Sequence, residues 1–397
     1  MRIDAHVHYT PPDLVKDLAA FSRQEPFWGL LLAPSADGKS VQGWATAERM
    51  LADMDQAGID RVVLMGEYRQ RHEGCVARND AALRIIRRWP DRVSAFAILQ
   101  PKAGPQALDE LKRCLDGGMC GVGELGPYGQ GYRPDDPDFL RLAEACIDAK
   151  IPLNLHVNEE IGHFYPGKAA TPLLHFYRLA CRYPELKLIL AHWGGGLLFY
   201  EIMPEVRRNL QNVWYDMAGS PLLYPTDAIF RMALTCVDHK KLLYGSDYPL
   251  LACPRKQQTP DFRPFIAEID ALGLDQVVYD DMMGNNAARL LGLLPADAAP
   301  KHAAARRRKP PVITEIQDTA GVAIGPLMAV SAVAQAWLET QPIFEAHHIP
   351  WQDSPAPYWE PINQAAAARG LGPDAQDELL RELNDAIAAS TADRETE

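Results

Sequence analysis

The sequence predicts an α/β fold, a closed (β/α)8 TIM barrel with an appended, mainly helical C-terminal segment. Short apolar runs that are typical of buried strands alternate with stretches of helical periodicity along most of the chain. Eight such units within about 250 residues match the size of a closed barrel, because strands alternating with helices imply right-handed crossovers and a parallel sheet. Histidines and carboxylates also recur at the ends of these runs, where the active sites of such barrels lie.

The expected strands and helices follow one another in order. Strands are expected at residues 2–8, 61–65, 93–99, 119–125, 151–157, 186–193, 213–217 and 241–247, each a short apolar run. Helices are expected at residues 47–57, 80–89, 106–117, 138–149, 172–183, 199–209 and 227–236. In the first strand apolar and polar residues alternate, so His6 and His8 lie side by side on one face of the strand. There, both imidazoles can bind one metal ion.

Six histidine and acidic residues stand at the ends of expected strands. They are His6 and His8 on the first strand, Glu124 on the fourth, His156 on the fifth, His192 on the sixth and Asp247 on the eighth. Taken alone, the two histidines could be ordinary surface residues, and Asp247 could form a turn with its own backbone. Because the carboxyl ends of barrel strands meet at one mouth, the recurrence of these residues favours a shared metal site.

Several motifs carry a family resemblance. They are Ile3-Asp4-Ala5-His6-Val7-His8, Gly121-Val122-Gly123-Glu124, Leu155-His156-Val157, Leu190-Ala191-His192-Trp193-Gly194-Gly195-Gly196, Tyr244-Gly245-Ser246-Asp247-Tyr248-Pro249 and Gly284-Asn285-Asn286-Ala287-Ala288-Arg289-Leu290-Leu291. As an ordered set, they resemble the amidohydrolase superfamily, especially its amidohydrolase-related branch that includes aminocarboxymuconate-semialdehyde decarboxylase. The resemblance implies a metal-dependent barrel enzyme whose metal ligands are His6, His8, His156 and Asp247. It also implies that His192 binds a second metal or polarises the substrate, and that Asp247 shuttles protons.

Imidazole and carboxylate donors suit a divalent metal, with zinc expected first and manganese or iron as alternatives. A protein-bound ion with an open position lowers the pKa of bound water to about 7, which makes hydroxide available at neutral pH. An aspartate beside that water can take its proton and pass it to a leaving group. We therefore predict Asp247 as a catalytic residue, and the family resemblance adds His192 as a second one.

Glu124 leaves the number of ions, one or two, open. It resembles the strand-four glutamate of TatD-type metal hydrolases, which implies a carboxylate that binds or bridges two ions. Alternatively, a glutamate at a barrel rim only orients a ligand histidine. The full set of expected metal ligands is His6, His8, Glu124, His156, His192 and Asp247.

Four residues are expected to contact substrate. Arg69, Arg71 and His72 follow the second strand on the mouth side, where an arginine can pair with a substrate carboxylate. Trp193 is followed by three glycines, which let a substrate approach the backbone closely. Alternatively, Arg69, Arg71 and His72 are solvated loop residues, and Trp193 with its glycines forms only a tight strand-to-helix turn. The insertion at residues 9–44 is expected to cover one side of the mouth, or to pack its aromatic residues on themselves.

The composition of the chain limits the classes of partner that it is expected to bind. A net charge of -12 argues against a nucleic-acid partner, because nucleic-acid-binding surfaces are usually basic. The chain has no apolar run long enough to span a membrane and enters a strand directly after Met1, so a cytoplasmic protein with no membrane partner is expected. Seven cysteines without paired spacing suit reduced thiols. The expected partner is a small-molecule or peptide-like substrate.

Three segments are expected along the chain. Residues 1–294 form the metal-dependent barrel domain, residues 295–311 a linker, and residues 312–397 a helical extension of unknown role. Within the extension, apolar residues recur at helical spacing over 324–338 and 373–389. The extension is small for a segment that must form an independent hydrophobic core. We therefore expect it to dock on the barrel, on a second copy of the chain or on a partner, and we expect a homo-oligomer.

Three functions fit these features. The first is a metal-dependent hydrolase that uses activated water on an amide, ester or lactone bond, favoured by the six candidate ligands including Glu124. The second is a non-oxidative decarboxylase or related lyase that acts on a carboxylate substrate at the same metal site. The third is a barrel scaffold or binding protein whose C-terminal segment recognises a partner. The substrate itself lies beyond the sequence, because specificity depends on loops.

Overall fold

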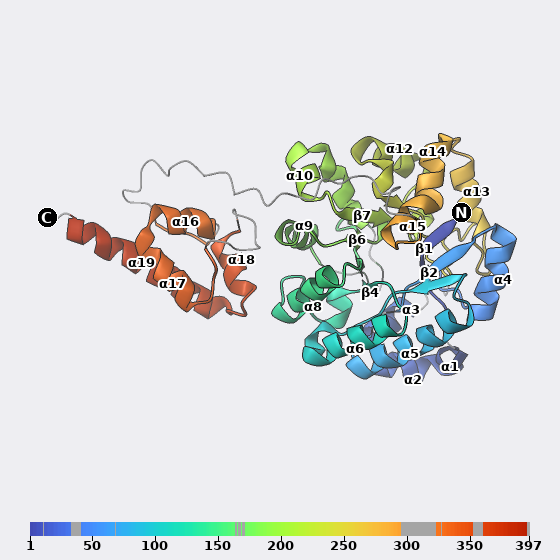
Figure 1. The fold of residues 1–397 in the computed structure, drawn as a ribbon, viewed down its shortest axis with the longest axis horizontal. Helices are drawn as coiled ribbons and strands as arrows, with labels where there is room; N and C mark the ends of the chain where they lie inside the picture. Colours follow the sequence, from blue (N-terminus) through green and yellow to red (C-terminus); the bar gives the residue numbers. More distant parts are fainter. Residues whose placement is uncertain are drawn as a thin grey trace.

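The structure is a computed structural model that describes residues 1–10, 12–32, 41–67, 69–162, 165, 168, 171–294, 323–326, 328–351 and 360–394. Within these residues, strands are surrounded by helices (Figure 1). The strands are β1 (Ile3–Val7), β2 (Arg61–Leu64), β3 (Val93–Ala95), β4 (Val122–Leu125), β5 (Leu153–Leu155), β6 (Leu188–Leu190), β7 (Val213–Asp216) and β8 (Leu242–Leu243). Each strand lies within the range expected for it.

The strands form a closed parallel barrel. Strands β1 to β3 pair in one run and β4 to β8 in a second, and every pairing is parallel. A bridge between Ala97 and Val122 joins the two runs, and a bridge between Val7 and Tyr248 joins the first strand to the end of the last. The expected (β/α)8 fold is therefore confirmed, and the carboxyl ends of all strands meet at one mouth.

Helices cover the outside of the barrel. They are α4 (Ala47–Ala57), α5 (His72–Arg88), α6 (Pro105–Asp116), α8 (Pro137–Asp148), α9 (Leu173–Arg182), α10 (Pro204–Asn209), α12 (Thr226–Cys236), α13 (Arg263–Asp270), α14 (Gln276–Asp280) and α15 (Asn286–Leu290). Further helical segments are α7 (Pro127–Gln130), α11 (Ser220–Leu223), η1 (Pro101–Ala103), η2 (His192–Ile202), η3 (His239–Lys241) and η4 (Asp281–Asn285).

Helix α5 begins at His72, well before the expected start at residue 80. Its buried face includes Arg78 and Asn79 in addition to Cys75 and the later apolar residues. Apolar periodicity does not detect a helix turn whose buried residues are polar, so it did not predict the first turns of α5.

The insertion after β1 forms α1 (Pro12–Lys16), α2 (Leu18–Gln24) and α3 (Pro26–Leu32), while residues 33–40 lie outside the described residues. The guanidinium of Arg69 lies over the ring of Phe21, 4.7 Å from its centroid. The ring of Phe27 meets that of Tyr128 at 5.6 Å. Arg69 follows β2 and Tyr128 follows β4, so Phe21 and Phe27 of the insertion pack on segments that follow strands at the mouth rather than only on each other.

The C-terminal extension forms α16 (Val330–Ala336), η6 (Leu338–Thr340), α17 (Gln341–Ala346), α18 (Ile362–Ala367) and α19 (Pro373–Arg394). The expected helix at 324–338 is thus shorter than predicted, and the expected linker at 295–311 lies outside the described residues. Val333, Phe344 and Leu379 are fully buried in a small apolar cluster of the extension itself. The extension therefore buries much of its apolar surface within itself, although its length had predicted too small a core for that.

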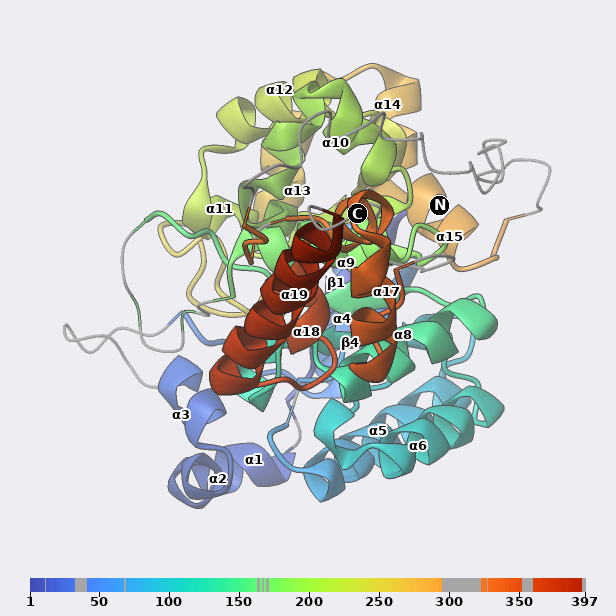
Figure 2. The same cartoon turned by 90° about the vertical axis from the view of Figure 1, so that its left-hand side faces the viewer.

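The extension also contacts the barrel of the same chain. Arg182 at the end of α9 forms an ion pair with Glu360, just before α18, with 2.8 Å between Nη1 and Oε1. Ala368, just after α18, belongs to the apolar cluster of the barrel. Figure 2 shows the extension lying over the side of the barrel that carries α8 and α9.

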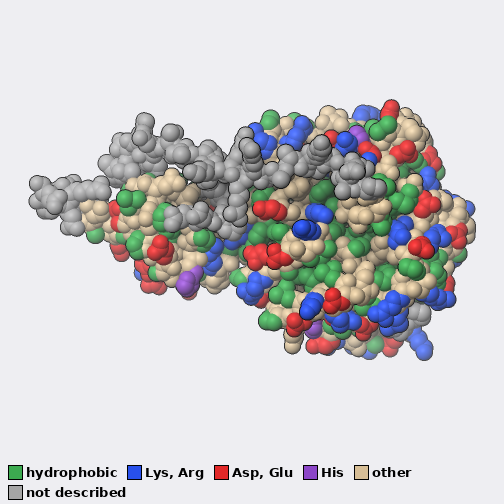
Figure 3. All heavy atoms as spheres, in the orientation of Figure 1, with side chains coloured by type: hydrophobic (Ala, Val, Ile, Leu, Met, Phe, Trp, Pro, Cys, Tyr) green, Lys and Arg blue, Asp and Glu red, His purple; other side chains and the backbone are tan. Residues whose placement is uncertain are grey.

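The surface carries charges of both signs. On the face that Figure 3 displays, acidic and basic side chains of the barrel are interspersed rather than separated into patches of one sign. None of the described helices combines the length and the apolar character needed to cross a membrane.

Candidate metal centre

The six expected ligands come together at the mouth of the barrel. His6 belongs to β1 and His8 follows it directly, while Glu124 belongs to β4. His156 directly follows β5, His192 opens η2 after β6, and Asp247 follows β8. Residues from five different strands thus meet because parallel strands end at the same rim.

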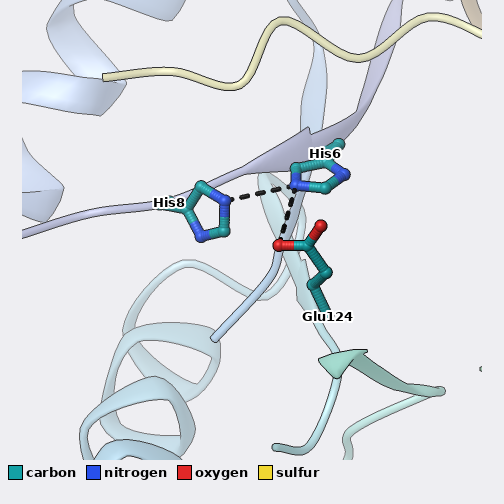
Figure 4. A group of neighbouring side chains, drawn as sticks. All are labelled: His6, His8 and Glu124. Atoms are coloured by element: carbon teal, nitrogen blue, oxygen red, sulfur yellow. Dashed lines mark hydrogen bonds and ion pairs between the residues drawn. The ribbon is translucent and has the colours of Figure 1, made fainter. Parts of the chain in front are cut away.

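The first group of donor atoms surrounds His6. Its Nε2 lies 3.2 Å from His8 Nε2 and 3.7 Å from Glu124 Oε2 (Figure 4). Asp247 Oδ1 lies 3.3 Å from His8 Nε2 and 3.9 Å from His6 Nε2. Two imidazole nitrogens and two carboxylate oxygens therefore face the same small space.

The second group shares Glu124 with the first. Glu124 Oε1 lies 2.7 Å from His156 Nδ1 and 3.3 Å from His192 Nε2, and these two nitrogens are 3.1 Å apart. In each group of three, the donor atoms lie within 4.8 Å of one another. Glu124 thus stands between two pairs of histidines, each of which can hold an ion together with its carboxylate.

The other ring nitrogen of each histidine has a hydrogen-bond partner. His6 Nδ1 lies 2.9 Å from Asp216 Oδ2, and His8 Nδ1 lies 3.2 Å from the Met65 carbonyl oxygen. His192 Nδ1 lies 2.8 Å from the Ala218 carbonyl oxygen. Because metal-binding histidines are usually oriented in this way, the arrangement is typical of a metal centre.

Asp216 was not among the residues singled out from the sequence. It is the last residue of β7 and is fully buried. Its position inside the apolar run at 213–217 could have indicated a functional residue, because a carboxylate is rarely buried without a specific partner.

The field of the carboxylates favours a bound cation. Burial by itself lowers the pKa of His6, but the charges of Asp216 and Glu124 outweigh it and raise that pKa to about 10. Burial raises the pKa of Asp247, yet the hydrogen bond from His8 and the charges of His6 and His192 lower it to about 2. The buried carboxylates thus favour positive charge beside them, which a divalent ion can supply in place of a proton on His6.

These residues fit a divalent metal. The donors are imidazole nitrogens and carboxylate oxygens, a set that zinc, manganese and iron all accept. His6 Nε2 and His8 Nε2 face each other at 3.2 Å, a separation at which both can donate a lone pair to one ion. The donor set, the burial and the negative field thus agree with the metal expected from the sequence.

Two loops of the centre have left-handed backbone conformations. The φ angles of His192, Trp193 and Asp247 are 56°, 58° and 64°. Such conformations cost non-glycine residues about 1–3 kcal/mol each and persist only where the surroundings hold them. Here the His192 N–H donates to Asp216 Oδ1 at 3.1 Å, and the Asp247 N–H donates to the His6 carbonyl oxygen at 3.0 Å.

The residues expected to contact substrate lie in different environments. Arg69 is 4% exposed and its Nη2 lies 3.4 Å from Glu67 Oε2, while Arg71 is exposed at the start of α5 and His72 is half-buried. Trp193 is fully buried, and its indole N–H donates to Ser220 Oγ at 2.9 Å. In this structure Arg69 and Trp193 are therefore engaged with the protein, and all four substrate contacts stay predictions.

The sequence profile of the Amidohydrolase family matches residues 3–293. The 2-amino-3-carboxymuconate-6-semialdehyde decarboxylase of Dictyostelium discoideum is 23% identical over 249 residues, which cover 55% of this chain and 66% of that protein. The chain thus spans slightly less than two thirds of the length of this relative.

Solved structures share the fold. The 5-carboxyvanillate decarboxylase of Sphingomonas paucimobilis superposes with a TM-score of 0.58 at 18% identity, over 73% of this chain and 98% of that one. The 5-carboxyvanillate decarboxylase of Novosphingobium aromaticivorans, complexed with manganese and a nitrobenzoic acid, gives a TM-score of 0.57 at 16% identity, over 74% and 96%. At these identities the likeness shows the fold, whereas the family profile covers most of the chain. The chain belongs to the amidohydrolase family, as its strand-end motifs predicted.

Proposed function

We propose that this protein is a metal-dependent, non-oxidative decarboxylase of a small carboxylate substrate. The sequence alone favoured hydrolysis and kept decarboxylation as the alternative. The observation that carries the change is the agreement between two findings: the relative named above is a decarboxylase, and the buried centre places candidate metal ligands beside two groups able to move protons. Zinc was expected first, and the manganese in a structural neighbour makes manganese an equal candidate.

The residues of the centre divide the work of this reaction. His6, His8, His156 and Asp247 would hold the ion, which when bound supplies positive charge that orients a substrate oxygen and withdraws electrons from the substrate. His192 is fixed through Nδ1 on the Ala218 carbonyl oxygen, so its Nε2 faces the centre. A proton held at that Nε2 can pass to the substrate carbon that carries the carboxylate. The bond to the carboxylate then breaks, its electron pair stays on the carbon skeleton, and carbon dioxide leaves.

Asp247 and burial support the same steps. Asp247 lies 3.3 Å from His8 Nε2 and is positioned to accept and return a proton within the centre. His6 is fully buried and His192 is 7% exposed, so little water competes for the proton transfer. Membership of an enzyme family and this assembled centre argue against the third alternative, a barrel that serves only as a scaffold.

Hydrolysis is the second candidate, and Glu124 is the observation that favours it. This carboxylate lies between two histidine pairs, an arrangement that can hold two ions and an attacking water. Two ions per chain would strengthen this candidate.

One experiment separates the two reactions. Enzyme loaded with Mn²⁺ or Zn²⁺ is incubated with a panel of aromatic and unsaturated carboxylic acids, and with esters, amides and lactones, in water labelled with ¹⁸O. A decarboxylase releases one carbon dioxide per product and places no ¹⁸O in the organic product. Incorporation of ¹⁸O into an acid or alcohol, without carbon dioxide release, would replace the proposal with hydrolysis.

A further inference from the structure

Asp216 makes an unusually complete set of contacts at the end of β7. Its Oδ2 accepts hydrogen bonds from His6 Nδ1 at 2.9 Å and from Asn154 Nδ2 at 3.0 Å. Its Oδ1 accepts from the backbone N–H groups of His192 and Ala218, each at 3.1 Å. The side chain is fully buried, so water does not compete for these bonds.

These contacts exclude two roles for Asp216. An ionised carboxylate offers about four lone-pair sites, and here all four are occupied. Asp216 is therefore not a further metal ligand, and it has no free oxygen with which to shuttle a proton to substrate. What remains is a role exerted through the residues that it contacts.

Each contact fixes a different part of the centre. A carboxylate can only accept, so the ring of His6 must carry its proton on Nδ1, and the lone pair of Nε2 then faces His8 and Glu124. The bond to the His192 N–H holds a residue whose φ angle is 56°. The bond to the Ala218 N–H fixes Ala218 itself, whose carbonyl oxygen accepts a hydrogen bond from His192 Nδ1 at 2.8 Å.

We propose that Asp216 is a positioning residue that sets the tautomer of His6 for metal binding and fixes His192 at the same time. The inference rests on the proposed metal-dependent function and assigns a residue outside the six expected ligands. Through one side chain, the end of β7 couples a metal-binding residue on β1 to a catalytic candidate after β6.

The Asp216→Asn variant tests the role of the tautomer. The amide keeps the size of the carboxylate, and its oxygen can still accept the two backbone N–H bonds. Its NH₂ group, however, donates toward His6 Nδ1, which moves the ring proton to Nε2, where the ion would bind. Asn154 Oδ1 has no hydrogen-bond partner among the described residues, so rotation of the Asn154 amide can accommodate the new NH₂ group. The variant should therefore fold.

Metal affinity is the measured quantity. Apoprotein is titrated with Mn²⁺ and Zn²⁺ against a chelator, and thermal unfolding of the apoprotein is followed in parallel. For Asp216→Asn we expect affinity to fall by about 10- to 100-fold, the usual effect of losing an outer partner of a ligand histidine. We expect the melting temperature of the apoprotein to change little. Unchanged affinity in a folded variant would overturn the proposal.

Glu201→Gln is the matched control. Glu201 is also a buried carboxylate beside β7, where it accepts from Tyr215 Oη at 2.6 Å and from Lys241 Nζ. Tyr215 precedes Asp216 and points to the other face of the strand. This variant should lose thermal stability and keep its metal affinity. An equal loss of affinity in Glu201→Gln would mean that any damage to β7 weakens the site, and the role of Asp216 would fall.

A measurement on the unmodified protein covers the case in which the variant does not fold. In the Zn²⁺-loaded protein, imidazole ¹H–¹⁵N spectra should show a slowly exchanging proton on Nδ1 of His6, because the ring is fully buried. A His6 ring without this proton would refute the assignment. Failure of the unmodified protein to bind any metal would instead refute the proposed function, so the two failures can be told apart.

Discussion

At the scale of single residues, His6 and His8 are predicted to determine whether an ion can bind. Both turn Nε2 into the centre, 3.2 Å apart, from alternate positions at the end of β1. Replacing both with alanine should remove the ion proposed for decarboxylation and abolish activity, because that ion loses two of its four expected ligands. The barrel should stay folded, since its stability comes mainly from the apolar faces of its strands and helices. Elemental analysis and circular dichroism of the purified variant test this prediction, and full metal content would contradict it.

Asp247 is the residue expected to manage protons. Asp247→Asn keeps the size of the side chain and one oxygen donor, but the amide cannot accept a proton near neutral pH. We expect turnover to fall by at least about 10²-fold, the usual contribution of a general acid or base. Metal content should fall less than in the double histidine variant. Normal turnover of the metal-loaded variant would move the proton transfer to another residue, with His192 the first to be tested.

Glu124 is the residue on which the predicted number of ions depends. Its two oxygens face different histidine pairs, so it can bridge two ions or orient the histidines around one. Under the proposed decarboxylation we expect one ion per chain, and we expect Glu124→Gln to lower metal affinity about 10-fold by releasing His156. Mass spectrometry of the native protein counts the ions directly. Two ions in the wild type, reduced to one in the variant, would contradict this prediction and favour hydrolysis.

At the scale of elements, the contact between α9 and the segment before α18 holds the C-terminal extension on the barrel. The side chains of Arg182 and Glu360 are 12% and 8% exposed, so each charge depends on the other for solvation. Removing one partner of a buried pair typically costs about 3–5 kcal/mol, whereas removing both costs less. We expect Arg182→Met to speed hydrogen exchange in α18 more than Arg182→Met with Glu360→Gln does. Equal exchange in wild type and both variants would mean that apolar contacts alone hold the extension.

At the scale of the whole molecule, the extension is the part most open to removal. All six expected ligands precede residue 294, and the extension has its own small apolar cluster. Truncation after Pro311 should leave the metal centre assembled but expose the face of α9 near Leu179 and Arg182, where Glu360 and Gln364 now pack. The truncation would leave the buried Arg182 without Glu360 and would expose Leu179, so we expect a change in oligomeric state or solubility. Light scattering and metal analysis of the truncated chain test this, and a soluble truncated chain with native mass and full activity would contradict it.

The sequence by itself predicted the barrel and the meeting of six polar residues. Both depend on local, repeated properties: the length and periodicity of apolar runs determine the strands, and parallel strands bring their carboxyl ends to one rim. His6, Glu124 and Asp247 could therefore be placed together without knowledge of any contact. Their role as metal ligands stays a prediction, because only a bound ion can establish it.

Only the tertiary structure revealed what holds these residues in place. Asp216 is 210 positions from His6 in the chain, and its bond to His6 Nδ1 has no local sequence signature. The partners of His8 and His192 are carbonyl oxygens of Met65 and Ala218, which every residue type offers equally. The burial of Trp193 and the position of the extension on α9 likewise depend on distant segments that pack together. Local pattern determines which side chains reach the mouth, whereas long-range packing decides how each is oriented there.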